Sequence, residues 1–332
     1  MRRMARRTKF AALAAGCLLP LVASASLAAE APYPNKPVNL LIGYAPGGVA
    51  DISLRFLAGK AEKTLGQPIV VTNNGGGGTS VATSIVATKP PDGYNILGVA
   101  STSVVRIPQF RPVPYKFDDI VPIMSYARPI MTPVVVQASS PWKTFKELVE
   151  HAKKNPGKLS YSTTGVGSPM HIAMEFVAKQ EGVTWTHVPY PGSVPAMTAL
   201  LGGHVNFQVG AGESIPHVKQ GTLRLLAMVD DKRVKDFPNV PTLKELGYDI
   251  YNESIFMFAA PKGTPKPIID KLDDALHKAM SDPEFESVMA KVEFEGQYMN
   301  SAATKKYLQD AYERIGKLIL ELRIPREADQ KK

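Results

Sequence analysis

The amino-acid sequence predicts an α/β protein, and three observations support this fold class. Short apolar runs alternate with segments of helical spacing, as where Val38–Ile42 precedes a helical pattern from Ile52 to Leu65. Turns rich in glycine and hydroxyl residues separate these segments. The chain has 332 residues, 44% of them apolar, which is enough for two domains of ordinary size. Such alternation predicts mostly parallel sheets with flanking helices, and ligands at the carboxyl ends of the strands.

The first 29 residues predict an export signal. Basic residues precede an apolar, alanine-rich stretch over 10–27, and small residues allow cleavage near Ala28 or Ala29. A membrane anchor and a lipoprotein modified at Cys17 are the alternatives. Because Cys17 is the only cysteine, cleavage would leave a mature protein without disulfides or thiolate sites. We therefore expect a protein exported to the periplasm.

The charge of the chain gives no indication of nucleic-acid binding. Five of the 39 basic residues lie in the predicted signal, which leaves 34 against 30 acidic residues. The Lys and Arg residues are scattered, and no basic run alternates with aromatic residues. We expect no nucleic acid as a partner, and the mild positive balance is compatible with small anionic ligands.

In the first part of the chain, strands are predicted over Val38–Ile42, 68–71 and 94–99, with helices over 52–65 and 79–87. The turn from Tyr44 to Asp51 joins the first strand directly to a helix. Its glycines let the backbone approach a ligand, and the free N–H groups of the helix's first turn can bind an anion. Residues 108–122 are rich in proline and are expected to be irregular.

The second part of the chain uses the same device twice more. Strands are predicted over 133–136, 159–161, 184–190, 205–209 and 223–229. Thr144 is a predicted N-cap, and Glu147 three residues later completes a capping box for a helix that runs to about Lys154. Ser168 is a natural N-cap with proline at the next position, and Gly192-Ser193 leads into a further helix. Several such turns, each at the end of a strand, favour a convergent anion site.

The last part of the chain predicts an apolar strand over 255–260 and helices over 266–280, 283–291 and 304–322. The glycine run at 75–78 lacks both the Gly-Lys-Ser/Thr ending and the G-x-G-x-x-G fingerprint, so we expect no nucleotide cofactor. The histidines show no metal-ligand spacing, so we expect no metal site and no cofactor.

A set of short motifs extends from about Tyr33 to Leu322. In chain order they are Tyr33-Pro34-Asn35-Lys36-Pro37, Pro46-Gly47-Gly48 with Asp51, Leu65-Gly66-Gln67-Pro68, Pro91-Asp92-Gly93-Tyr94, Pro156-Gly157-Lys158-Leu159, His187-Val188-Pro189-Tyr190 with Gly192-Ser193, Leu200-Leu201-Gly202-Gly203 and Ala260-Pro261-Lys262-Gly263-Thr264-Pro265. Jointly they resemble the solute receptors of tripartite tricarboxylate transporters, the Bug-type periplasmic binding proteins.

The resemblance implies a two-lobed periplasmic-binding-protein-like fold of type II with a hinged cleft. By analogy, lobe 1 comprises residues 33–131 plus 254–332, and lobe 2 comprises residues 132–253. It also implies a receptor, not an enzyme, that binds a small organic carboxylate and delivers it to the membrane subunits of a transporter. We expect a dicarboxylate, aliphatic or aromatic, and a monomeric receptor.

The resemblance also implies a set of ligand-binding positions, in which backbone amides, hydroxyls and ordered waters hold the carboxylate. From lobe 1 they are Tyr44, Pro46, Gly47, Gly48, Asp51, Ser101 and Thr102. From lobe 2 they are Thr163, Thr164, Gly165, Ser168, His171, Tyr190, Gly192, Ser193 and Glu213. For Tyr44 the alternative is core packing, and for Glu213 it is a solvated loop carboxylate. Arg128, near the expected hinge, is a further candidate for neutralising a second carboxylate.

The sequence departs from the family pattern at several positions. Asn73-Asn74 replaces the usual Asn-Arg pair before the glycine loop, and Ile255 replaces a common tryptophan. These departures concern the ligand and leave its identity open, with tricarboxylates and amino acids among the alternatives. A periplasmic sensor for a membrane signalling system is a second interpretation. A hydrolase using Ser168 and His171 is a third, against which the Gly-x-Ser-x-Gly elbow is missing.

Overall fold

The computed structural model describes residues 32–190, 192–324 and 326. Tyr33–Lys332 form one compact unit. The predicted export signal, with Cys17 and the cleavage site, lies outside the described residues. None of the helices in the described part of the chain is long and apolar enough to cross a membrane.

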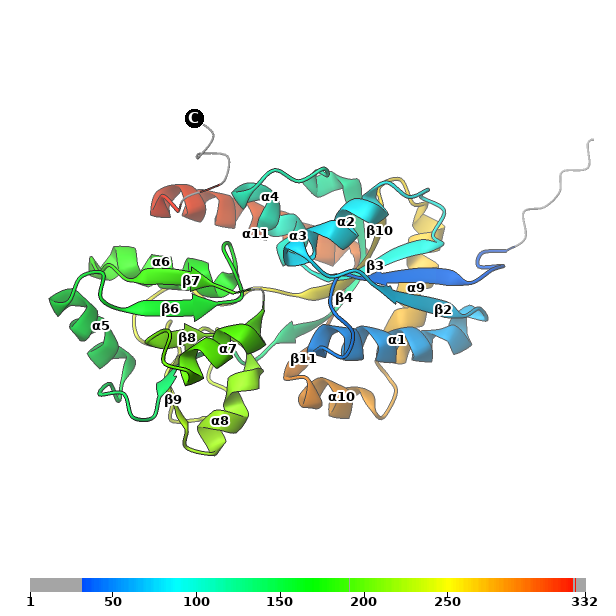
Figure 1. The fold of residues 1–332 in the computed structure, drawn as a ribbon. Helices are drawn as coiled ribbons and strands as arrows, with labels where there is room; N and C mark the ends of the chain where they lie inside the picture. Colours follow the sequence, from blue (N-terminus) through cyan, green and yellow to red (C-terminus); the bar gives the residue numbers. More distant parts are fainter. Residues whose placement is uncertain (1–31, 191, 325, 327–332) are drawn as a thin grey trace, which may run out of the picture. The chain divides into compact units, whose positions relative to one another are not determined.

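Two β-sheets form the framework of residues 33–332 (Figure 1). The six-stranded sheet contains, in order across the sheet, β11 (Phe294–Asn300), β4 (Ile120–Pro129), β10 (Phe256–Pro261), β3 (Asn95–Ala100), β1 (Val38–Ile42) and β2 (Ile69–Asn73). The five-stranded sheet contains β7 (Thr186–Pro189), β6 (Ser160–Thr163), β8 (Phe207–Val209), β5 (Pro133–Gln137) and β9 (Leu223–Met228). This two-sheet arrangement with flanking helices confirms the predicted α/β class.

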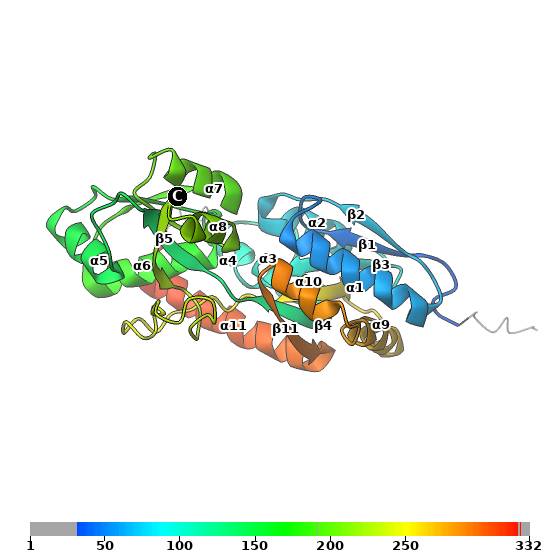
Figure 2. The ribbon, with the colours of Figure 1, turned by 90° about the horizontal axis from the view of Figure 1, so that it is seen from below.

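Helices cover both faces of the six-stranded sheet. One face carries α1 (Val49–Leu65), α9 (Lys266–Ala279) and α10 (Phe285–Lys291). The other carries α2 (Ser80–Ala87), α3 (Thr102–Val105), α4 (Ile107–Phe110) and α11 (Ser301–Leu322). Alternation along β10 explains the two layers, because Phe256 and Phe258 join the first core whereas Met257 and Ala259 join the second. Figure 2 shows α1 and α10 from the side of the first face.

The five-stranded sheet carries its own helices. They are α5 (Phe145–Lys154), α6 (Pro169–Glu181), α7 (Ser193–Leu201) and α8 (Ile215–Lys219). Short 3-10 segments occur at η1 (Gly77–Thr79), η2 (Phe117–Asp119) and η3 (Gly212–Ser214). Helix α5 begins as predicted, since the side chain of Thr144 accepts a hydrogen bond from the N–H of Glu147.

The pairing of the strands is mixed, which corrects the expectation of mostly parallel sheets. The pairs β1–β2, β1–β3, β6–β7 and β6–β8 are parallel. The pairs that β10 makes with β3 and β4, that β11 makes with β4, and that β5 makes with β8 and β9 are antiparallel. The reason is the connectivity, because β4 leaves the first sheet towards β5 and β10 brings the chain back in the opposite direction.

Two strands and two short helices were not predicted from the sequence. Strand β4 begins within the proline-rich stretch expected to be irregular, and it contains Pro122 and Pro129. Strand β11 lies at the edge of its sheet and is largely polar. Helices α3 and α4 follow β3 in a stretch for which the sequence predicted no helix.

The two connections between the sheets are tied to each other by hydrogen bonds. Asn252 donates through Nδ2 to Oγ1 of Thr132 at 3.0 Å, and its N–H donates to the carbonyl of Val229 at 2.6 Å. The N–H of Val229 in turn donates to the carbonyl of Thr132 at 2.8 Å. The predicted lobe boundaries at 131/132 and 253/254 fall in these connecting segments, and the division into lobes stays a prediction.

Candidate functional site

The turn between β1 and α1, residues 44–51, is called here the first-sheet turn. Gly47 adopts a left-handed conformation with φ of 78°, and Gly48 is the N-cap of α1. Because glycine has no side chain, the helix begins without a side-chain cap. The N–H groups of its first turn therefore remain available to an acceptor from outside the chain.

Asp51 holds this turn in shape from within. Its Oδ2 accepts the N–H of Gly47 at 2.9 Å, and its Oδ1 accepts Nε of Arg55 at 2.8 Å and Nδ2 of Asn73 at 2.7 Å. The residue is only 3% exposed. Burial acts to raise the pKa of Asp51, but the hydrogen bonds from Asn73, Gly47 and Arg55 outweigh it and hold the pKa below its usual value. Asp51 is thus a charged brace, and its contact with ligand or water stays a prediction.

Tyr44 connects the first-sheet turn to the end of β3. Its phenol oxygen accepts the N–H of Ala100 at 3.1 Å, and its ring centroid lies 6.0 Å from that of Phe256. Its carbonyl accepts Nδ2 of Asn73 at 2.9 Å. Burial raises the pKa of the Tyr44 phenol despite the hydrogen bond from Ala100, so the hydroxyl stays protonated. Tyr44 therefore packs against Phe256, which corresponds to core packing, the alternative to ligand contact that the sequence left open for this residue.

Ser101 and Thr102 follow β3, next to the first-sheet turn. Ser101 is buried and exchanges two hydrogen bonds with Ile255, donating its N–H to the carbonyl at 2.8 Å and accepting the N–H of Ile255 on Oγ at 3.2 Å. Thr102 is partly exposed, and its hydroxyl oxygen accepts a hydrogen bond from Arg106 at 3.3 Å. Because β3, β1 and β2 are parallel neighbours, these residues and the first-sheet turn share one edge of the sheet.

The turn between β6 and α6, residues 163–171, is called here the second-sheet turn. Oγ of Ser168 accepts the N–H of His171 at 3.2 Å, which confirms the predicted N-cap. Oγ1 of Thr163 accepts the N–H of Gly165 at 3.2 Å. The Thr164 hydroxyl is turned to the sulfur of Met170 at 3.8 Å. This turn, unlike the first, contains no charged residue.

His171 is buried within the second-sheet turn and is neutral. Its Nδ1 accepts the N–H of Gly167 at 3.2 Å, so Nε2 carries the proton. Its ring stacks on His187 with centroids 4.0 Å apart, and Nε2 of His187 lies 2.7 Å from Oγ1 of Thr163. The pKa of His171 is lowered to about 3, mainly by burial and to a smaller extent by the electrostatic effect of His187. Burial also lowers the pKa of His187 to about 4.

The geometry of His171 bears directly on the hydrolase interpretation. A serine hydrolase needs the imidazole ring to accept the proton of the serine hydroxyl. Here the ring nitrogen Nδ1 is occupied by Gly167, and the contact between His171 and Ser168 comes from the main-chain N–H. The pair is therefore a helix cap and not a nucleophile with its base.

Ser193 and Glu213 form the third group of candidate residues. Oγ of Ser193 donates to Oε2 of Glu213 at 2.7 Å and accepts the N–H of Ala211 at 3.2 Å. Gly192 is the N-cap of α7, which has no side-chain cap. The N–H of Tyr190 donates to the carbonyl of Thr163 at 3.0 Å, so this group adjoins the second-sheet turn.

The structure thus gathers the candidates into groups. Tyr44, Gly47 and Asp51 are joined through Asn73, with Pro46 and Gly48 in the same turn. Ser101 and Thr102 lie at the neighbouring strand end. Thr163, Gly165, Ser168 and His171 share the second-sheet turn, and Ser193 with Glu213 lies beside it. Their assignment to one ligand site stays a prediction.

Four further residues at these groups were missed by sequence reasoning. Asn73 braces the first-sheet turn, Arg106 contacts Thr102, and Phe110 lies 6.5 Å from the His171 ring. Glu293 lies against Gly212. Its pKa is raised to about 7, mainly by burial and to a smaller extent by the negative charge of Glu213. Only Asn73 had a signal, because it belongs to the Asn73-Asn74 pair noted before the glycine loop, in which Asn74 takes the place of the usual arginine.

Two other predictions concern charge and metal. Arg128 is engaged in ion pairs with Glu295 at 2.7 Å and Asp231 at 3.0 Å. Among the described residues, no group of three or more His, Cys, Asp and Glu side chains is arranged to hold a metal ion.

Comparison with known proteins gives a consistent result. The model of the tripartite tricarboxylate transporter family receptor matches residues 53–324. The "UPF0065 protein in gbd 5'region" of Cupriavidus necator is 41% identical over 92% of each chain. The solved periplasmic binding protein BugD is 30% identical, covers 89% of this chain and all of its own, and superposes with a TM-score of 0.76. The R. palustris protein Rpa4515, solved with adipate, is 25% identical with a TM-score of 0.79, over 88% of this chain and 99% of its own.

Proposed function

Because this chain belongs to the receptor family of tripartite tricarboxylate transporters, we propose that it binds a small organic dicarboxylate and delivers it to the membrane subunits of such a transporter. The chain is a solute-binding receptor and not an enzyme. The family consists of periplasmic receptors. Export of this chain through cleavage near Ala28 or Ala29 is part of the proposal.

The uncapped start of α1 at Gly48 is the single observation that carries the proposal. A carboxylate at that point would accept N–H groups that have no acceptor from a side-chain cap. The macrodipole of this 17-residue helix favours the negative charge. Each charge-assisted hydrogen bond contributes about 1.5–3 kcal/mol, so a few of them give a useful affinity without an arginine in contact with the ligand.

The second sheet supplies the groups for the other end of the ligand. Ser168 offers a hydroxyl proton, and the Gly192 cap leaves the start of α7 open. The neutral state of His171 and His187 means that this part of the site relies on dipoles and hydroxyls. Two separated donor sets favour a molecule with two acidic ends, and adipate in the R. palustris relative is such a molecule.

A thermal-shift screen tests the proposed function. Ligand-free protein would be heated with succinate, malate, adipate, citrate and terephthalate, and with sodium chloride at matched ionic strength as the control. We expect the unfolding midpoint to rise with at least one diacid, because a ligand that binds the folded state stabilises it by mass action. Flat curves across the panel with properly stripped protein would contradict the proposal.

A further inference from the structure

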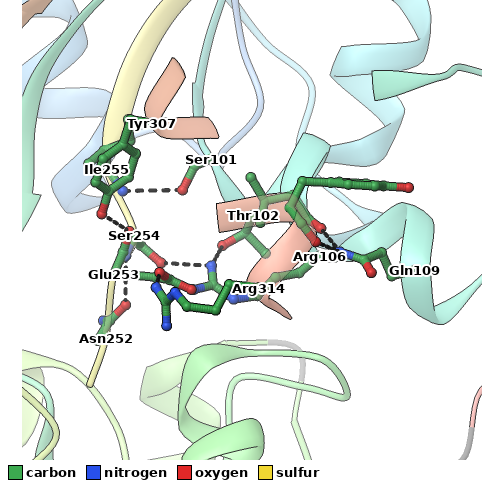
Figure 3. Close-up of polar contacts among 12 residues, drawn as sticks. Ser101, Thr102, Arg106, Gln109, Asn252, Glu253, Ser254, Ile255, Tyr307 and Arg314 are labelled. Atoms are coloured by element: carbon green, nitrogen blue, oxygen red, sulfur yellow. Dashed lines mark hydrogen bonds and ion pairs between the residues drawn. The ribbon is translucent and has the colours of Figure 1, made fainter. Parts of the chain in front are cut away.

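Arg106 is a fully buried arginine behind the candidate contact Thr102. It lies between α3 and α4, is 1% exposed, and comes from a stretch in which sequence reasoning expected no functional residue. Its Nη1 donates to Oγ1 of Thr102 at 3.3 Å and to Oγ of Ser254 at 3.2 Å. Figure 3 shows the guanidinium between α3 and the segment 252–255 that leads into β10.

The charge of Arg106 is only partly balanced. Its Nη2 lies 3.5 Å from Oε1 of Glu253, and the side chain of Glu253 is itself only 3% exposed. The other oxygen of Glu253 contacts Arg314 of α11, so one carboxylate serves two guanidinium groups (Figure 3). Nε of Arg106 has no hydrogen-bond partner among the described residues. A positive charge therefore remains on this cluster of Arg106, Glu253 and Arg314.

The excess charge acts mainly through Arg106. The side chain of Arg314 is 45% exposed, so solvent screens its charge, whereas the guanidinium of Arg106 is shielded from water. Burial lowers the pKa of Arg106 to about 10, with Tyr307 raising it and Arg314 lowering it further. Arg106 accordingly stays protonated at neutral pH.

The contact with Thr102 also fixes the role of a hydroxyl. Because Arg106 can only donate, it uses Oγ1 of Thr102 as an acceptor. The proton of Thr102 is then directed to another acceptor, and Thr102 is partly exposed at the strand end where the ligand is proposed to bind. The same arginine engages Ser254, which ties this strand end to the connection between the sheets.

We propose that Arg106 is a positioning residue that selects an anionic group at Ser101–Thr102, by turning the Thr102 hydroxyl into a donor and by placing a buried positive charge behind it. This inference rests on the proposed function. Arg106 touches no ligand and acts through Thr102 and through its field. A purely structural ion pair would not need this residue, because Arg314 already pairs with Glu253.

The test measures affinity by calorimetry for the diacid that stabilises the wild type most in the panel above. Arg106→Gln should weaken binding about 10- to 100-fold, the equivalent of one charge-assisted hydrogen bond. Arg106→Lys, which keeps the charge, should restore part of that loss. Glu253→Gln removes the neutralising carboxylate and should leave binding unchanged or tighter. A structural role predicts weaker binding for both charge-removing variants.

A double-mutant cycle separates action through Thr102 from general damage. Thr102→Val should weaken binding, and adding Arg106→Gln should then cost clearly less than it does alone. The matched control is Arg224→Gln, because Arg224 donates to the backbone carbonyls of residues 138, 140 and 142 by the second sheet. That control should lower the unfolding midpoint without changing affinity.

The outcomes distinguish the two proposals. If the wild type binds no member of the panel, the proposed function fails, and this inference with it. If the wild type binds a diacid and Arg106→Gln binds it equally well, the inference alone is overturned. Additive losses in the Thr102→Val background, or parallel losses in Arg106→Gln and Glu253→Gln, would also overturn it.

Discussion

The first-sheet turn and the second-sheet turn have the same architecture, a strand that ends in a turn and starts a helix, but they are held by different means. Asp51 braces the first with a carboxylate that accepts three hydrogen bonds from the chain. Ser168 and the neutral His171 brace the second without any charge. The charged side chain of the first turn is thus used internally, which leaves the open amides at Gly48 for a ligand. Charge in a binding turn need not indicate a charge contact with the ligand.

Among the variants of the two turns, Gly48→Val should give the largest loss of binding, at least about tenfold, because its Cβ would stand in front of the open amides. The fold should tolerate it, since Gly48 has φ of −77° and an added Cβ would meet only the carbonyl of Ala45 at 3.6 Å. Calorimetric titration with the best diacid measures the loss. Gly59→Ala, within the same helix and with open space at its Cβ, is the control and should bind normally. Unchanged affinity in Gly48→Val would show that the ligand does not use this helix start.

Asp51→Asn should lower the free energy of unfolding by about 1–3 kcal/mol, because it removes a buried charged acceptor. Binding should weaken with it, since the first-sheet turn loses its brace. Arg55→Gln is the matched control, and it should cost less than about 1 kcal/mol because Arg55 is 43% exposed and its ion pair is screened. Urea unfolding at pH 7 measures both. If Asp51→Asn kept full stability yet lost binding, Asp51 would be a ligand contact in place of a brace.

The neutral histidines make the second-sheet turn sensitive to acid. His171 and His187 have pKa values lowered to about 3 and about 4, so the unfolded chain binds more protons below its histidine pKa of about 6.5. Stability is therefore lost as the pH falls from about 6.5. Each histidine contributes up to about 2 kcal/mol of this loss by pH 5, from 1.36 kcal/mol per pKa unit.

Two acidic residues change the stability in the opposite direction as the pH falls. The contribution of a histidine must therefore be measured by comparing the wild type with a histidine variant. Glu293 and Asp230 have pKa values raised to about 7 and about 6, chiefly by burial, and their contributions favour the folded state at lower pH. The free energy of unfolding of His171→Gln, measured at pH 7 and pH 5, should fall by less than that of the wild type. An identical fall in both proteins would mean that His171 is protonated in the folded state.

Ser168→Ala should have a small effect on stability, about 1 kcal/mol, which is typical for loss of an N-cap. It should also weaken diacid binding several-fold if Ser168 donates to the ligand. Thr144→Ala removes an equivalent cap from α5, where Thr144 accepts the N–H of Glu147. It should cost the same stability and leave binding intact. Equal affinities for the two variants would restrict Ser168 to a capping role.

The sequence was most informative where the chain follows local rules. Apolar runs bounded by glycine turns located β1, β3 and β10, and the caps of α5 and α6 were predicted to the residue. Strand β4 was not predicted because its prolines argue against a strand. In the folded protein its pairing with both β10 and β11 outweighs this local preference. Strand β11 was not predicted because it is an edge strand with many polar residues, and it therefore lacks the apolar run by which strands were recognised.

The site was less predictable than the fold because its groups are assembled from distant residues. The candidate turns followed from motifs, but their internal bracing did not. Asn73 reaches Asp51 across 22 positions, and Arg106 reaches Glu253 across 147. A local sequence pattern cannot predict these two contacts, because they depend on the parallel pairing of β1 with β2 and on the return of the chain through β10.

Binding of a diacid by backbone amides and hydroxyls from both sheets is the central claim, and calorimetry on ligand-free wild-type protein tests it most directly. The protein would be titrated with the best diacid of the panel and with the corresponding diamide, which has the same shape but no charge. We expect measurable binding of the diacid and at least about 100-fold weaker binding of the diamide, the loss of one or two charge-assisted hydrogen bonds. Equal binding of the two compounds would contradict an anion site at these turns.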